Sequence, residues 1–189
     1  MKRCWETSDE AYNAYHDDEW GRPVIDETGV LERLCLEGFQ SGLSWLTILR
    51  KRENFRSAFA GFDPDAVARF GERDVRRLLS DAGIVRHRGK IEATIANAGA
   101  TVALRDASTP LETLFWSHRP ARERPPRSVG DWAATTPESV ALSKALRRAG
   151  FRFVGPTTAY AAMQACGVVN DHLAGCFVRD AVERLRPST

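Results

Sequence analysis

The sequence predicts an all-α fold, and two observations support this prediction. Between the glycines and prolines that punctuate the chain, apolar residues recur at helical spacing, and runs of alternating β-branched residues are nearly absent. The chain has 189 residues, of which 43% are hydrophobic and 28% are charged, a composition typical of a domain that buries its own core. We therefore expect residues 1–189 to form a single domain built from two helical lobes.

The first half of the chain contains five expected helices. A helix over 27–38 places Leu31, Leu34 and Cys35 on one face. A break at Ser41-Gly42 precedes a second helix, which Ser44 is expected to cap. The same apolar spacing predicts short helices and one longer helix over 64–70, 74–82 and about 90–103.

The second half begins with a loop. Closely spaced prolines within 117–131 forbid a regular helix, and we expect the arginines of this Arg/Pro-rich loop to stay solvated. The next helix has Thr136 as its cap and Pro137 at its first position, and it ends at Gly150. A final apolar helix is expected over 157–166, closed by Gly167.

Charge and hydropathy restrict the possible partners. Residues 1–40 carry 4 basic and 10 acidic side chains, whereas residues 41–189 have a net charge of +8. A basic field suits a polyanion such as nucleic acid, although it is equally compatible with solubility alone. No apolar run approaches the roughly 18 residues of a membrane span, and the N-terminal residues lack the apolar core of a signal peptide. We therefore expect no membrane partner and a cytoplasmic location.

The cysteines divide into two kinds. Cys35 and Cys166 lie among apolar residues and are expected to be buried as small hydrophobes. The other two each have a histidine within reach, and the pairs are Cys4 with His16 and His172 with Cys176. Two thiolates and two imidazoles form the tetrahedral set that Zn²⁺ prefers, and four protein ligands make a structural site. The alternative is two unrelated buried cysteines and two surface histidines.

The segment 81–91 joins two amphipathic helices through a short turn. We expect Gly83 to adopt a positive φ there, so that free amides at the start of the second helix can face a phosphate oxygen. Arg86, Arg88 and Lys90 would add positive charge. This pattern is typical of a helix-hairpin-helix, but similar junctions occur in proteins that never contact DNA.

An aromatic and acidic cluster lies near the N-terminus. Trp5, Tyr12, Tyr15 and Trp20 alternate with carboxylates within 5–20. Ring faces and carboxylates both attract positive charge, so the cluster could form a pocket for a flat cation. The alternative is an aromatic minicore with a solvated acidic edge, and Glu37 could then be either a surface residue or a pocket residue.

Five blocks of the sequence, in the same order, closely resemble the bacterial DNA-3-methyladenine glycosylase I family. They extend the likeness from Cys4 to about Cys176 and read YHDDEWG at 15–21, CLEGFQSGLSW at 35–45, DAGIVRHRGKI at 81–91, FRFVG at 151–155 and MQACGVVNDH at 163–172. The resemblance implies a helix-hairpin-helix fold and an enzyme that flips 3-methyladenine out of duplex DNA and hydrolyses its N-glycosidic bond. It also implies one structural Zn²⁺ per chain that clips residues 4–16 to residues 172–176.

The resemblance further implies roles for single residues. Glu37 would be the catalytic residue and, with Tyr15, would hydrogen-bond the extruded base, on which Trp45 would stack. The remaining pocket wall would comprise Tyr12, Trp5 and Trp20. Residues placed to contact DNA would be Gly42 and Leu43, which fill the gap in the duplex, together with Gly83, Arg86, Arg88 and Lys90 of the hairpin.

Small departures from the family pattern and one rival function remain. One residue appears deleted between Cys4 and Tyr12, which could shift Trp5 relative to the base, and Asp171 beside His172 is expected to be structural. No counterpart of a lysine nucleophile is found, so we expect no strand cleavage. The rival is a non-catalytic zinc-clipped module that binds damaged DNA. A monomer would suffice for either function.

Overall fold

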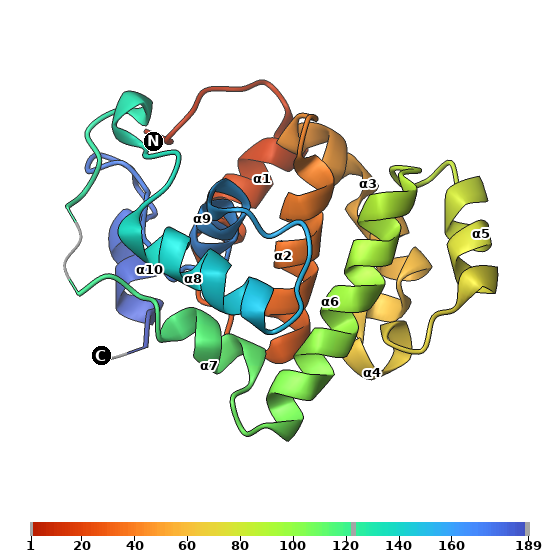
Figure 1. Ribbon diagram of the computed structural model, residues 1–189. Coiled ribbons are helices and arrows are strands. Elements are labelled where there is room, and N and C mark those ends of the chain that lie inside the picture. Colours follow the sequence, from red (N-terminus) through yellow and green to blue (C-terminus); the bar gives the residue numbers. More distant parts are fainter. Residues whose placement is uncertain (1, 122–123, 188–189) are drawn as a thin grey trace.

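The computed structural model describes residues 2–121 and 124–187, and all the regular elements in these ranges are helices (Figure 1). This confirms the predicted all-α class. The α-helices are α1 (Glu10–Asp18), α2 (Glu27–Gln40), α3 (Trp45–Ala58), α4 (Pro64–Val67), α5 (Glu72–Ser80), α6 (Arg88–Asp106), α7 (Leu111–Trp116), α8 (Pro137–Arg148), α9 (Pro156–Ala165) and α10 (Arg179–Leu185). Two short 3₁₀ turns are η1 (Ala60–Phe62) and η2 (Val129–Asp131).

Helix α2 forms the centre of the fold. It packs against α3, α6, α7 and α9, and Figure 1 shows it between α6 on one side and the α8–α9 pair on the other. Nine of its 14 residues are buried, which is typical of a helix surrounded by others rather than an amphipathic surface helix. Two of these nine are glutamates, Glu32 and Glu37. Glu32 is paired with Arg56, whereas Glu37 lies in the cleft described below.

Two clusters of buried side chains stabilise the molecule. The larger runs from Val24 to Val169 and holds a group of phenylalanines around Phe39, Phe55 and Phe59. The smaller cluster joins residues near the two ends of the chain to Leu49 of α3, and its other members are Cys4, Tyr15, Trp20, Leu173, Cys176 and Val178. In Figure 1 the two ends of the chain lie on the side of the molecule away from α5.

Several predicted helix boundaries are confirmed by their caps. Ser44 accepts a hydrogen bond from the Thr47 amide, and Thr136 accepts one from the Ser139 amide. Gly167 ends α9 with a φ of 73°, and a Cβ at this position would collide with the backbone of Gly21 and Arg22. Gly167 is therefore required both by its own conformation and by the chain packed against it.

Other boundaries differ from the prediction. The helix expected over 64–70 stops at Val67, because single 3₁₀-type bonds from Arg69 and Phe70 close its end. Helices α1, α7 and α10 were not predicted, since they are short and rich in charged or aromatic residues. The expectation of solvated loop arginines is wrong for Arg119, which pairs with Glu183 and donates to the Pro187 carbonyl. Among the described residues, no helix is long and apolar enough to cross a membrane.

Candidate active site and metal centre

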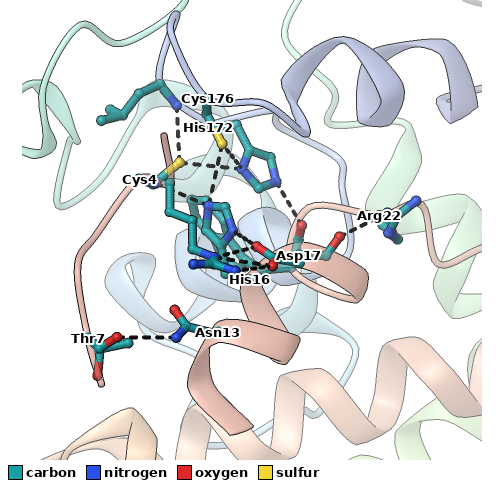
Figure 2. Close-up of polar contacts among 11 residues, drawn as sticks. Cys4, Thr7, Asn13, His16, Asp17, Arg22, His172 and Cys176 are labelled. Carbon is teal, nitrogen blue, oxygen red and sulfur yellow. Dashed lines mark hydrogen bonds and ion pairs between the residues drawn. The ribbon is translucent and has the colours of Figure 1, made fainter. Parts of the chain in front are cut away.

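A group of two cysteines and two histidines lies where the ends of the chain meet (Figure 2). Cys4, His16, His172 and Cys176 are all buried, and their ligand atoms lie within 4.8 Å of one another. Cys4 Sγ lies 3.4 Å from His172 Nδ1, and Cys176 Sγ lies 3.5 Å from both His172 Nδ1 and His16 Nε2. A tetrahedral Zn²⁺ would separate sulfur and nitrogen ligands by about 3.6 Å. The donor set and its spacing therefore fit a structural metal ion.

Neighbouring groups orient both imidazoles toward the thiols. Asp17 Oδ1 lies 2.7 Å from His16 Nδ1 and is itself held by Arg3, so His16 presents Nε2 to the group. The Trp20 carbonyl lies 2.9 Å from His172 Nε2, so His172 presents Nδ1. This pattern of outer partners is usual for metal-bound histidines.

Burial favours the neutral forms of Cys4, His16 and His172 when no cation is present. It raises the pKa of the Cys4 thiol to about 12 and lowers the pKa of His172 to about 4. A bound divalent cation would favour the thiolates and the neutral imidazoles instead. The structure excludes the alternative of surface histidines, because His16 and His172 are both 0% exposed.

An aromatic cleft of about 230 Å³ lies beside this group. It contains all six residues that were predicted to bind the base, namely Trp5, Tyr12, Tyr15, Trp20, Glu37 and Trp45. Four further residues line it, and they are Gln40, Trp132, Ala161 and Gln164. Sequence reasoning assigned none of these four to the cleft. Gln40 and Gln164 lie inside blocks that resemble the family, but the direction of their side chains could not be read from the sequence, and Trp132 and Ala161 lie outside the blocks.

Helix geometry positions the aromatic walls. Tyr12 and Tyr15 are three residues apart on α1 and stack with ring centroids 6.4 Å apart. Trp45 is the first residue of α3, and its ring lies 5.3 Å from that of Tyr15. Trp5 packs edge-on against Trp20, with ring centroids 5.1 Å apart. No described residue accepts a hydrogen bond from the buried indole N–H of either Trp5 or Trp45.

Glu37 places a carboxyl group in the cleft. Its residue is only 8% exposed, and none of the described residues donates a hydrogen bond to its carboxyl or pairs with it. Burial raises its pKa to about 8. Its charge in turn contributes to the raised pKa of Tyr12, of Tyr15 and of Cys166, for each of which burial is the larger cause. A cation in the cleft would supply the missing counter-charge.

The turn between α2 and α3 presents an apolar tip at the edge of the cleft. Gly42 has a φ of 81°, with no neighbouring atom within 4 Å of a Cβ added there, and Leu43 is 42% exposed. Gln40 and Trp45 flank this turn and both line the cleft. Leu43 is therefore an exposed aliphatic side chain directly beside the candidate base site.

The hairpin between α5 and α6 differs from the prediction at Gly83. Its φ lies outside the left-handed region, because the positive-φ glycines of the described chain are 21, 42, 61, 150 and 167. A Cβ on Gly83 would approach Asp81 Oδ1 to 2.9 Å and Asn54 to 3.1 Å. The glycine is needed for close packing against α3, and the predicted positive φ is wrong.

The three cations of the hairpin have different environments. Lys90 is buried, and its Nζ donates to the carbonyls of Phe39 and Ser41 at 2.9 and 2.6 Å, so the expectation of a free charge there is wrong. Arg88 pairs with Glu72 and Glu92. Arg86 is exposed and forms no ion pair with any described residue. The amides of Arg88 and Gly89 in the first turn of α6 also lack an acceptor within the described chain.

Phe153 is an exposed aromatic residue on this same face. It is 45% exposed and has a φ of 55°, which is a strained conformation for an aromatic residue. Asn97 holds the preceding residue, Arg152, by accepting from its amide at 2.7 Å and donating to its carbonyl at 3.2 Å. The Phe153 ring lies 6.3 Å from that of His87, the N-cap of α6. Phe153 belongs to the FRFVG block, but its exposure could not be read from the sequence.

Comparisons with known proteins agree with one another. A family model described as methyladenine glycosylase matches residues 5–179. The chain is 49% identical to DNA-3-methyladenine glycosylase 1 of Escherichia coli over 180 residues, which cover 93% of this chain and 96% of the relative. It is 43% identical to the DNA-3-methyladenine glycosylase of Haemophilus influenzae, with 92% and 96% covered.

Solved structures extend the likeness to three dimensions. A crystal structure of 3-methyladenine DNA glycosylase I superimposes with a TM-score of 0.90 at 48% identity, covering 93% of this chain and 98% of that one. The Staphylococcus aureus enzyme, solved to explain its recognition of 3-methyladenine, superimposes with a TM-score of 0.87 at 34% identity, covering 92% and 93%. By its sequence and by its structure, the chain belongs to the methyladenine glycosylase family.

Proposed function

We propose that the enzyme holds 3-methyladenine, rotated out of alkylated duplex DNA, in the aromatic cleft and hydrolyses its N-glycosyl bond, leaving an abasic site. The enzyme is thus a hydrolase of N-glycosyl bonds, like the relatives whose names specify 3-methyladenine. The observation that carries the proposal is the buried carboxyl of Glu37, which lies without a counter-charge in a cleft lined by six aromatic side chains.

The chemistry of the lesion matches the cleft. Methylation at N3 leaves adenine formally cationic, so the base is already a good leaving group and its glycosyl bond is weak. Normal adenine carries no charge, so it gains less than the methylated cation from Glu37 and from the ring faces. The cleft therefore selects the damaged base by charge and shape, and the reaction needs recognition and electrostatic stabilisation more than a strong acid.

Hydrolysis without strand cleavage is the outcome we propose. No lysine lines the cleft in the described structure, and Lys90, on the neighbouring α6, uses its Nζ to bond two carbonyls. Strand cleavage by a glycosylase would require an amine that attacks the sugar carbon. Glu37, Tyr15 and Trp45 are the residues that we propose bind the base.

We propose Zn²⁺ for the Cys4/His16/His172/Cys176 group. When bound, it would supply a rigid tetrahedral link and no open position for a reactive water, since all four ligands come from the protein. The link joins the segments that carry Trp5 and Tyr15 to the segment after α9, and so it holds the walls of the cleft together.

We propose that duplex DNA lies across the α2–α3 turn and the hairpin. Leu43 would enter the space left by the rotated nucleotide, and the Arg88 and Gly89 amides with Arg86 would contact phosphate, as in a helix-hairpin-helix. The alternative function, a module that binds damaged DNA without turnover, would use the same face. One copy of the chain holds the complete cleft, so a monomer is sufficient.

Release of free base from methylated duplex DNA tests this proposal. The wild-type protein should release 3-methyladenine but not 7-methylguanine, while Glu37→Gln should lose on the order of 100-fold in rate and Trp45→Ala at least about tenfold. Glu53→Gln, the same change at an exposed glutamate of α3, is the matched control and should behave as the wild type. Binding to the DNA without release of base would establish the non-catalytic module instead.

A further inference from the structure

Gln164 and Asp171 form a hydrogen-bonded pair on one wall of the cleft. Gln164 lies in the last turn of α9 and lines the cleft, three residues after Ala161 on the same face. Its Nε2 donates to Asp171 Oδ2 at 2.7 Å, and the Tyr160 hydroxyl donates to the same oxygen at 2.6 Å. Neither residue of the pair has a role in the function proposed above.

The pair fixes which atom of the amide faces the cleft. A carboxylate oxygen that receives two donors can only accept, so the nitrogen of the Gln164 amide must point toward Asp171. Trp132 Nε1 donates to the Asp171 carbonyl at 2.9 Å and so holds the backbone of this residue in place. Turning the amide over would bring two oxygens together and lose a hydrogen bond of charged type.

The carbonyl oxygen of Gln164 is left as a free acceptor. No described residue donates to Oε1, and Oε1 is not among the enclosed side-chain atoms that lack a partner. Because Gln164 lines the cleft and one N–H of its amide is bonded to Asp171, Oε1 is the acceptor that this side chain offers to a ligand there. The acceptors that line the cleft thus include Glu37 on α2 and Gln164 on α9, two helices packed against each other.

We infer that Gln164 is a specificity-determining residue whose Oε1 accepts a hydrogen bond from the 6-amino group of the bound base, and that Asp171 is its positioning residue. This inference rests on the function proposed above. An adenine ring presents an amino donor at C6, whereas a hypoxanthine ring presents a carbonyl acceptor there. An acceptor held in a fixed position forms a hydrogen bond with the amino group of the adenine ring and is repelled by the carbonyl oxygen of the hypoxanthine ring. A site that accepts from an N–H group therefore binds an analogue without that group more weakly.

Binding of two free bases tests the inference. The probes are 3-methyladenine and 3-methylhypoxanthine, which share the N3-methyl group and differ at C6. Quenching of tryptophan fluorescence gives both dissociation constants, because four of the five tryptophans of the chain line the cleft. Gln164→Met keeps the length of the side chain and removes the acceptor, and Lys144→Met, at an exposed position of α8, is the matched control.

The expected result is a change in selectivity. Gln164→Met should bind 3-methyladenine about tenfold more weakly and should lose most of the preference over 3-methylhypoxanthine. Asp171→Asn, which permits the amide to turn over, should lower the same ratio by several-fold and serves as the second variant if Gln164→Met does not fold. Lys144→Met should keep the wild-type ratio.

The outcomes separate this inference from the proposed function. If Gln164→Met and Asp171→Asn weaken both bases equally, or change only the melting temperature, then the pair is structural and the inference is overturned. If both variants keep the wild-type affinities and ratio, it is overturned as well. If the wild-type protein binds neither base and releases no 3-methyladenine from DNA, then the proposed function itself fails.

Discussion

The cleft and the α5–α6 hairpin differ in whether their charged side chains have partners within the protein. In the cleft, Glu37 is buried without a cation beside it among the described residues. In the hairpin, Lys90 is buried but bonded to two carbonyls, and Arg88 is exposed and paired with two glutamates. A satisfied charge stabilises the fold, whereas an unsatisfied buried one costs stability and is kept where a ligand will meet it. This difference supports our proposal that the cleft is where the charge of the ligand binds.

The proposed zinc site gives the largest expected effect, because the metal link would hold the cleft walls in place. Cys176→Ala should abolish stoichiometric zinc binding and lower the free energy of unfolding by more than about 4 kcal/mol. Cys166→Ala is the matched control, since Cys166 is equally buried but lies outside the group, and it should cost only about 1 kcal/mol. Metal analysis and urea unfolding measure both. Equal losses in the two variants would contradict a metal clip.

Glu37 should destabilise the protein at alkaline pH. Its pKa is raised by burial from 4.5 to about 8, so the native protein binds more protons than the unfolded chain between these values, and stability falls as pH rises through this window. Glu37→Gln should therefore raise the free energy of unfolding by about 4 kcal/mol at pH 9 and change it little at pH 4.5. Urea unfolding across this range measures whether the variant is more or less stable than the wild type. A loss of stability at pH 9 would contradict an unpaired, buried carboxyl at Glu37.

Variants of Lys90 and Arg86 distinguish a cation that stabilises the fold from one that we propose binds DNA. Lys90→Met leaves two carbonyls at the end of α2 without their donor and should cost about 2 kcal/mol of stability, with no change in the salt dependence of DNA binding. Arg86→Met should leave stability within about 0.5 kcal/mol and reduce the slope of log affinity against log salt by about 1. A reduced slope in the Lys90 variant would show that its charge does reach the phosphates.

Phe153 gives a small expected difference in stability between two variants. Because its φ of 55° suits glycine better than other residues, Phe153→Gly should be about 1 kcal/mol more stable than Phe153→Ala. Thermal unfolding of the two variants measures this difference. If the alanine variant is the more stable one, then the loop relaxes and the strain inferred at this position is absent.

Sequence reasoning succeeded where the signal was local or was carried by long blocks. Ser44, Thr136 and Gly167 cap their helices as predicted, because a cap depends on only a few neighbouring residues. The family resemblance brought Trp5, Glu37 and Trp45 into one cleft, although 40 residues separate the first from the last. Spacing alone could not decide this, since a cluster of aromatic and acidic residues is equally compatible with a minicore.

The misses have a common physical cause. The sequence shows that Arg86, Arg88 and Lys90 are close along the chain, but not which of them finds a partner on another helix. Glu72 forms an ion pair with Arg88, and a carbonyl at the end of α2 accepts a hydrogen bond from Lys90. The position of Gln164 in the cleft could likewise not be predicted, because the orientation of its amide depends on Asp171 and on which face of α9 is turned toward the cleft. Partners that are distant in sequence determine which polar groups are free.

The pH dependence of kcat/KM for release of 3-methyladenine from duplex DNA tests the central claim most directly. The free enzyme determines this quantity, so kcat/KM should rise with pH through an apparent pKa of about 8 as Glu37 ionises to receive the cationic base. Tyr12, Tyr15 and Cys166 face the same carboxyl, and burial keeps all three neutral over that range. In Glu37→Gln the rise should be absent and the rate uniformly low. A rise that persists in Glu37→Gln would show that another group carries the recognition of charge.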